Sequence, residues 1–221
     1  MNQKAEIKNI WRIVSASDSS VLELRAIWPN GVDGQKRTVI KHFNAADYAD
    51  LDERKAAFES EALRLNSSGY NVYVVMNPIK TNLSGRAAKD QDIDHRKILL
   101  VDIDRAGVAK QPATDDEIMA AAQLGDLVAR RMASMGWPEP IRTMSGNGHH
   151  LYYVLPALPN DDTSTGKIQQ LLRSLAGEFN TDALRIDTSV FNAARITKVV
   201  GTVARKGSES DGRPYRMARV I

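Results

Sequence analysis

An apolar segment that ends in two closely spaced carboxylates restricts the possible folds of this chain more than any other feature. The residues from Ile98 to Ile103 are aliphatic apart from Asp102, and Asp104 follows directly. A run this short, without Gly or Pro, predicts a buried β-strand rather than a helix. Because side chains alternate along a strand, Asp102 and Asp104 would share one face and the intervening aliphatic side chains the other.

Two carboxylates on one face of a buried strand are unfavourable without a partner, because they lose hydration and repel each other. A divalent cation would remove both costs, and Mg²⁺ prefers oxygen ligands. The alternative is that the strand runs out into an acidic turn in which both side chains stay hydrated.

Composition narrows the class of protein. The 221 residues suffice for one large domain or two small ones. No run approaches the roughly 18–20 apolar residues of a membrane span, and the first residues lack a signal-peptide apolar region. We therefore expect a cytoplasmic protein without membrane contact. Cysteine is absent, which excludes disulfides and Cys-ligated zinc, so no zinc is expected.

Charge is unevenly spread along the chain. The formal net charge is +3, yet residues 185–221 contain eight Lys or Arg and only three Asp or Glu. A basic C-terminal segment indicates partners that carry phosphate. The alternative is a solvated basic edge without a ligand.

The first 80 residues predict an N-terminal α/β subdomain. A short helix or arm falls within 1–18, and strands are expected at 21–28 and 38–43, joined by the turn 29–34. Asp50 is a candidate N-cap of a helix with Phe58, Ala62 and Leu65 on one face, and a strand follows at 71–76. The polar residues 81–94 are expected to form a connecting loop.

Residues 95–221 predict a second subdomain, and together the two would form a single domain. The acidic strand at about 97–104 precedes a helix that a Thr114–Glu117 capping box begins and Gly136 ends. Strands at 141–145 and 149–155, a helix near 168–179, and strands at 184–187 and 195–200 follow. This β-α-β-β-α-β order predicts an α+β, ferredoxin-like (RRM-like) catalytic sheet over about 97–203, with the first and third strands as neighbours.

That topology would bring three pieces together: the two aspartates, the hairpin segment 145–150, and Asp187. Three carboxylates around one point hold two Mg²⁺ ions about 3.5–4 Å apart, the arrangement used for in-line phosphoryl displacement.

The remaining candidates would bind the anion. Gly146 and Gly148 would allow backbone N–H groups to approach it closely. Ser145 and His150 would hydrogen-bond a triphosphate, and two basic residues, Arg195 and Lys198, would neutralise its charge.

Each piece also has a purely structural interpretation. The two glycines would make a tight turn only, and His150 would be a satisfied histidine of the sheet. Asp187 would cap a strand end, and Arg195 and Lys198 would be solvated charges. Finding all the pieces in the expected order on one fold favours the functional interpretation.

The order Asp-x-Asp, then Ser-Gly-x-Gly-x-His-Leu-Tyr, then hydrophobic-Asp resembles the archaeo-eukaryotic primase (primase-polymerase) superfamily. It looks most like primase domains of plasmids, phages and integrated mobile elements. Supporting segments are 71–78, the Gly-Trp-Pro at 136–138, and 186–202, so that the resemblance spans about residues 70–216.

The resemblance implies a nucleotidyltransferase, a DNA primase or DNA-directed polymerase that makes or extends primers. It implies that Asp102, Asp104 and Asp187 bind two Mg²⁺ or Mn²⁺ ions and that His150 contacts the phosphates of the incoming nucleotide. Ser145 with its glycine turn would help to hold the triphosphate. The implied partners are a single-stranded DNA template, NTP or dNTP substrates, a primer strand and a replicative helicase.

Some modules of related primases are absent from this sequence. It has no cysteine zinc module, no helical domain after the catalytic motifs and no Gly-x-x-x-x-Gly-Lys-Ser/Thr ATPase motif. Because the zinc module and the helical domain bear on starting a primer rather than extending one, the sequence leaves open whether this chain starts primers or only extends them.

Three other classes of protein share parts of the pattern. Rolling-circle initiators and relaxases need His-hydrophobic-His on one strand face, whereas His149 and His150 would face opposite sides. A non-catalytic ferredoxin-like nucleic-acid-binding module would stack bases on sheet aromatics, where the two aspartates would repel phosphate. A nucleotide cyclase-like palm also uses paired acids and triphosphates.

Overall fold

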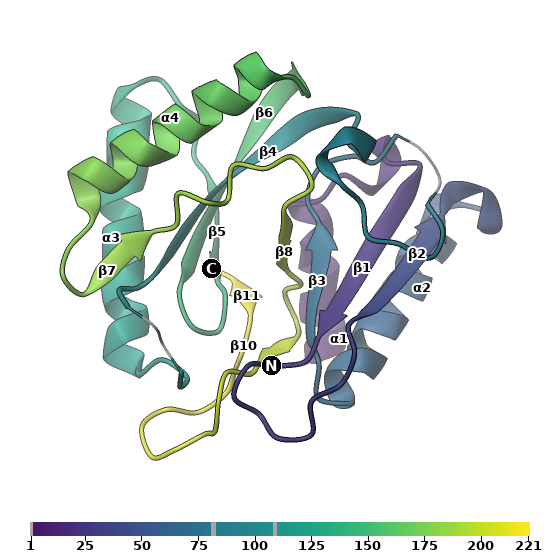
Figure 1. The fold of residues 1–221 in the computed structure, drawn as a ribbon, viewed down its shortest axis with the longest axis horizontal. Helices are drawn as coiled ribbons and strands as arrows, with labels where there is room; N and C mark the ends of the chain where they lie inside the picture. Colours follow the sequence, from purple (N-terminus) through teal and green to yellow (C-terminus); the bar gives the residue numbers. More distant parts are fainter. Residues whose placement is uncertain (1, 81–82, 108–109) are drawn as a thin grey trace.

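The computed structural model describes residues 2–80, 83–107 and 110–221. Within these ranges the chain forms four α-helices and antiparallel sheets (Figure 1). A four-stranded sheet and a five-stranded sheet are the main layers, and a two-stranded ribbon lies near the C-terminus. Of the helices in the described part, none is sufficiently long and apolar to cross a membrane.

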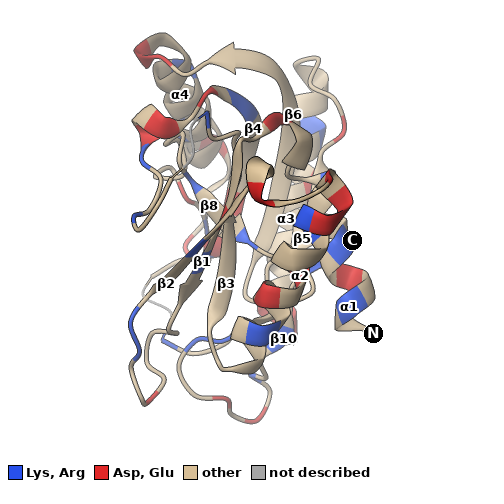
Figure 2. Ribbon diagram, turned by 90° about the vertical axis from the view of Figure 1, so that its right-hand side faces the viewer, with Lys and Arg blue, Asp and Glu red and all other residues tan. Residues whose placement is uncertain are grey.

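The four-stranded sheet has the order β2-β1-β3-β8. Its strands are β1 (Val21–Ile27), β2 (Val39–Asn44), β3 (Asn71–Val75) and β8 (Ile196–Lys198). Helix α2 (Leu51–Ser67) packs on it after the short helix α1 (Gln3–Glu6), and both helices carry charges of both signs (Figure 2). As predicted, the Asp50 side chain caps α2, and Phe58, Ala62 and Leu65 are buried.

The five-stranded sheet has the order β11-β5-β6-β4-β7, and its neighbours pair antiparallel. Its strands are β4 (His95–Arg105), β5 (Ile141–Met144), β6 (His149–Pro159), β7 (Leu184–Ile186) and β11 (Arg219–Val220). Helices α3 (Asp115–Ser134) and α4 (Asp162–Phe179) lie on the same side of this sheet (Figure 1). The predicted capping box at Thr114 and Glu117 begins α3.

The long strands β4 and β6 lie side by side at the centre of this sheet, and Asp102 is the register partner of His150. The expected adjacency of the acidic strand and the second hairpin strand is therefore confirmed. The side chains of Leu99, Val101 and Ile103 are at most 1% exposed, whereas those of the two aspartates lie on the opposite face. The alternation read from the sequence holds, and it leaves the acidic face directed away from α3 and α4.

The expected strand at 195–200 was assigned to the wrong sheet. Residues Ile196–Lys198 form β8, which pairs with β3 through Tyr73–Lys198 and Val74–Thr197 rather than joining the sheet of β4. The free edge of β4 is instead taken by β7, which directly follows α4. A three-residue strand fits either edge by its pattern of side chains, so the pairing depends on which edge remains open.

Two further segments differ from expectation. Residues 216–220 supply β10 (Arg216–Met217), which pairs with β9 (Val203–Ala204), and the edge strand β11, where the sequence indicated no clear element. The expected connecting loop at 81–94 includes 81–82, which lie outside the described residues. Its remainder has one 3-10 turn, Asp90–Asp92, and the Ala88 N–H donates to buried Glu23 in β1.

Candidate active site

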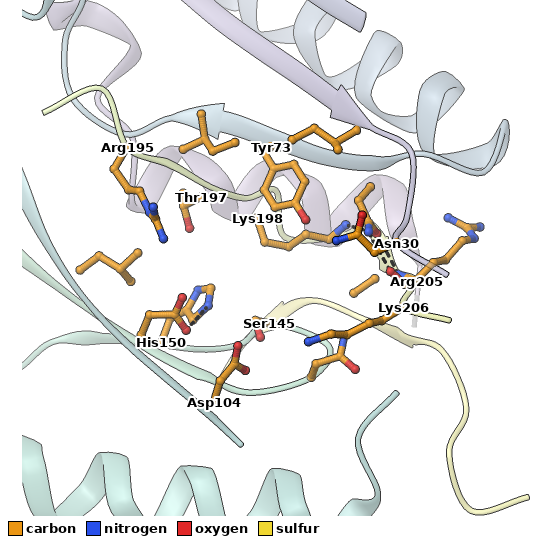
Figure 3. A pocket seen from close by; sticks show the side chains of 17 residues that line it. Asn30, Tyr73, Asp104, Ser145, His150, Arg195, Thr197, Lys198, Arg205 and Lys206 are labelled. Carbon is orange, nitrogen blue, oxygen red and sulfur yellow. Dashed lines mark hydrogen bonds and ion pairs between the residues drawn. The ribbon is translucent and has the colours of Figure 1, made fainter. Parts of the chain in front are cut away.

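A cavity of about 430 Å³ lies between the acidic face of β4 and β6 and the strands β3 and β8 (Figure 3). In Figure 3, Tyr73, Arg195 and Lys198 enter it from one side and Asp104, Ser145 and His150 from the other. The full lining is Ile27, Asn30, Asn71, Tyr73, Leu100, Asp102, Asp104, Ser145, Asn147, His150, Arg195, Ile196, Thr197, Lys198, Ala204, Arg205 and Lys206. Both sheets therefore contribute to one site.

The two strand carboxylates differ in how well their negative charge is compensated. Burial and the neighbouring Asp102 raise the pKa of Asp104 to about 6. Burial would also raise the pKa of Asp102, but the positive charge on His150, with Arg195 and Lys206, outweighs it and holds that pKa below its ordinary value.

Asp102 Oδ1 lies 3.2 Å from His150 Nε2. This is an electrostatic contact rather than an aligned hydrogen bond, because this buried oxygen has no well-directed donor. A buried carboxylate oxygen without a donor, beside a second carboxylate of raised pKa, fits a divalent cation.

His150 is held on both sides of its ring. Its Nδ1 lies 2.8 Å from the hydroxyl of Tyr152, which in turn lies 2.5 Å from Oγ1 of Thr197. Burial alone would lower the pKa of His150, but Tyr152 and Asp102 outweigh it and raise that pKa. The ring therefore presents a positively charged Nε2 edge to Asp102 at the wall of the cavity.

Lys198 and Arg205 are basic side chains that form no salt bridge with a carboxylate among the described residues. Lys198 is 5% exposed, and its Nζ lies 3.1 Å from the carbonyl of Val203 and 3.4 Å from Asn71 Oδ1. Within the described residues its Nζ contacts no carboxylate, and burial, with Arg205 nearby, lowers its pKa well below the usual range. Arg205 has one buried guanidinium nitrogen without a hydrogen-bond partner. An anionic ligand would supply the negative charge and the hydrogen-bond acceptors that these two side chains lack.

The turn that contains Gly146 and Gly148 packs closely against neighbouring residues of the site. Gly148 lies against Asp104, and a Cβ there would overlap Asp104 Oδ1 and the carbonyl of Ile103. Gly146 has a φ of +103° and faces Ala204. The Gly148 N–H donates to Ser145 Oγ over 3.0 Å, so this N–H is engaged within the turn. Ser145 lines the cavity, and its predicted contact with phosphate stays a prediction.

Asp187 lies beside the site without entering the lining. Its backbone N–H donates to the carbonyl of Asp102 over 2.8 Å. Its carboxylate accepts from the Ser189 N–H over 2.8 Å and contacts Arg195 Nη2 at 3.2 Å. Among residues 2–80, 83–107 and 110–221, no three acidic or histidine side chains form a group that would hold a metal. The structure thus joins Asp102 to Asp104, and the third ligand role of Asp187 stays a prediction.

His149 and His150 lie on opposite faces of β6, as strand geometry requires. His149 is buried against Gly125 of α3, and burial, with His150 and Arg142, lowers its pKa to about 4. The pair therefore does not converge on one metal, which argues against the relaxase alternative.

Several lining residues were not identified from the sequence. Arg205 and Lys206 belong to the basic C-terminal segment, and that segment was the available signal for them. Tyr73 and Asn30 gave no signal, because their places depend on how the two sheets pack. Burial, together with Asp102 and Asp104, raises the pKa of Tyr73 to about 12, so its hydroxyl stays protonated.

No family model and no curated protein sequence matches this chain. Solved structures do match it, among them a primase, a primase catalytic domain and a polymerase domain. The resemblance to primase-polymerases is thereby confirmed at the level of the fold.

The particular structures share little sequence with it. The primase RepB′ has a TM-score of 0.53 at 13% identity over 97% of this chain, which spans about half (55%) of that protein. The catalytic domain of primase RepB′ in complex with initiator DNA gives 0.52 at 14% identity, with 97% of this chain and 82% of that chain covered. The polymerase domain of Mycobacterium tuberculosis ligase D in complex with DNA gives 0.53 at 14%, with 96% and 79% covered.

Proposed function

We propose that this chain is a single-domain DNA primase-polymerase, a nucleotidyltransferase that makes or extends primers on single-stranded DNA. The observation that carries the proposal is one cavity in which two carboxylates, a histidine and several basic side chains meet, on a fold shared with primase and polymerase domains. We assign the sheet that contains β4, β5, β6 and β7 to the ferredoxin-like type. We also assign residues 1–80 and 95–221 to two subdomains of the single domain.

Asp102 and Asp104 would hold Mg²⁺ or Mn²⁺, because they are the described carboxylates that line the cavity, and the buried Oδ1 of Asp102 has no well-directed donor. When bound, such a cation lowers the pKa of an attacking hydroxyl and neutralises a leaving pyrophosphate. Asp187 is the candidate third ligand, and its contact with Arg195 would have to loosen for that role.

The chain's own residues would bind and orient the nucleotide. His150 directs Nε2 to the cavity beside the carboxylates, at the place where an α- or β-phosphate would meet both. Lys198, Arg205 and Lys206 line the same cavity and would neutralise the remaining phosphate charge. Arg195 and Ser145 complete this set. The reaction is attack of a primer 3′-hydroxyl on the α-phosphate, with pyrophosphate leaving.

The biological setting is part of the proposal. The sequence resemblance favours replication of a plasmid, phage or mobile element in the cytoplasm, with a replicative helicase as partner. Two of the similar structures are complexes with DNA, which supports a DNA template here.

The test is synthesis on unprimed and primed single-stranded DNA, with Mg²⁺ or Mn²⁺ and labelled NTPs or dNTPs. Product on both templates would show a primase, and product on the primed one alone would show a polymerase core. Asp102→Asn should abolish product, whereas the matched control Asp182→Asn, an exposed acid outside the cavity, should not.

The binding-module alternative makes the opposite prediction. No product on either template, together with tight DNA binding that persists in EDTA, would refute the proposed enzyme and favour that alternative. Full activity in Asp102→Asn would refute the assignment of the carboxylates.

A further inference from the structure

A chain of polar contacts connects the acidic strand to the opposite sheet. It runs from Asp102 to His150 across the β4–β6 pair, then to Tyr152 two residues along β6, and then to Thr197 on β8. Strand β6 belongs to the five-stranded sheet and β8 to the four-stranded sheet. The Tyr152–Thr197 bond therefore links the two walls of the cavity directly.

Burial makes this link costly to break. Tyr152 is 1% exposed and Thr197 2% exposed, so water does not replace either hydroxyl contact. A buried hydroxyl left without a partner is unfavourable, which keeps the two side chains together. Tyr152 also packs edge-on against the His150 ring, with ring centroids 5.7 Å apart. The histidine ring is thus fixed by one hydrogen bond and one aromatic contact.

The chemistry of the two hydroxyls suits this position. A tyrosine and a threonine hydroxyl each donate one hydrogen bond and accept others. With the His150 ring positively charged, its Nδ1 donates to the Tyr152 hydroxyl, which can in turn donate to Thr197 Oγ1. Nδ1 is thereby occupied, and Nε2 is left to face Asp102 and the cavity.

We propose that Tyr152 and Thr197 are positioning residues that lock the His150 ring with Nε2 toward the nucleotide site and hold β8 against β6. The role for His150 rests on the proposed function. The position of β8 matters for the same reason, because Lys198 follows Thr197 directly and Arg195 lies just before the strand. One buried hydroxyl pair would thereby align the histidine with the phosphate-binding cations.

The first test measures binding of ATP and dATP in the presence of Mg²⁺. Tyr152→Phe and Thr197→Val should each weaken nucleotide binding about tenfold, whereas Thr197→Ser should restore it, because serine keeps the hydroxyl. Tyr153→Phe is the matched control, since Tyr153 lies on the opposite face of β6 and its buried hydroxyl has no partner in the described chain. It should bind nucleotide as the wild type does.

A double-mutant comparison separates positioning from general packing. In a His150→Ala background, Tyr152→Phe should cause a smaller loss of nucleotide binding than in the wild type, because only the contact with β8 is then left to lose. Equal loss in both backgrounds would overturn the proposal, as would unchanged binding in Tyr152→Phe and Thr197→Val.

A second readout does not depend on nucleotide or activity. Nitrogen chemical shifts of the His150 ring report the hydrogen bond at Nδ1, and they should change in Tyr152→Phe but not in Tyr153→Phe. If the wild type makes no product yet the shifts change, the proposed function fails and the positioning of the ring stands. If the shifts do not change, the inference fails whatever the activity.

Discussion

Replacing Asp104 by Asn should make the metal-free protein more stable while it removes synthesis. Asp104 has a pKa of about 6 in the folded chain, about two units above the ordinary value of an unfolded aspartate. At about 1.4 kcal/mol per unit, the folded state loses up to roughly 3 kcal/mol when this carboxylate is ionised. Partial solvent exposure reduces this, so we expect a gain of about 2 kcal/mol from the neutral amide.

The direction of the pKa shift determines the pH range in which Asp104 affects stability. Because the pKa of Asp104 is raised on folding, its stabilising contribution is complete below about pH 4 and is lost as pH rises through 6. The difference between Asp104→Asn and wild type should therefore be small at pH 4 and largest above pH 7. For a chain of this length, about 2 kcal/mol corresponds to roughly 4–8 °C in Tm.

The assay is thermal or urea unfolding in EDTA at pH 4.5 and pH 8. Asp182→Asn, the exposed control, should change stability little at either pH. Added Mg²⁺ or Mn²⁺ should stabilise the wild type and have a smaller effect on Asp104→Asn. If Asp104→Asn is no more stable than wild type at pH 8, the reasoning about charge at this site is refuted.

Three further perturbations test other parts of the structure. Gly148→Ala should displace Asp104 and the carbonyl of Ile103. We expect it to lower the free energy of unfolding in urea by about 1–3 kcal/mol and to remove most primer synthesis. Unchanged stability together with unchanged synthesis would contradict the close packing. Lys198→Met should raise the nucleotide KM at least tenfold without lowering Tm, because it removes a buried amine that has no carboxylate partner in the described part of the chain. An unchanged KM would exclude a phosphate contact. Because the pKa of His149 is about 4 in the folded chain, the free energy of unfolding should fall by up to roughly 3 kcal/mol as pH drops from about 6.5 toward 4. His149→Gln should remove much of this pH dependence, measured by unfolding at several pH values.

Sequence reasoning was most successful where the signal is local. The capping residues of α2 and α3, the alternation along β4, and the pairing of β4 with β6 follow from neighbouring residues and one hairpin. Asp102, Asp104 and His150 could be brought together on that basis alone, because adjacent strands fix their spacing. The cavity lining includes all three.

Information on contacts between the two sheets was not present in any local pattern. Strand β8 was placed in the wrong sheet because three residues do not specify which edge they join. Tyr73 and Arg205 were not recognised as lining residues for the same reason, since each reaches the cavity only through sheet packing. Asp187 was predicted as a third ligand, and the structure pairs it with Arg195.

The crossing of β8 to the first sheet also determines the order in which this protein can fold. Strand β3 ends at Val75, and its partner β8 begins only at Ile196, so more than a hundred residues must be synthesised between them. Contacts of such long sequence separation form late, because closing a long loop costs entropy before the contact can stabilise it. The pairing of β3 with β8 also completes the cavity. A nascent chain whose β8 has not yet left the ribosome would therefore carry the carboxylates without Arg195 and Lys198 facing them.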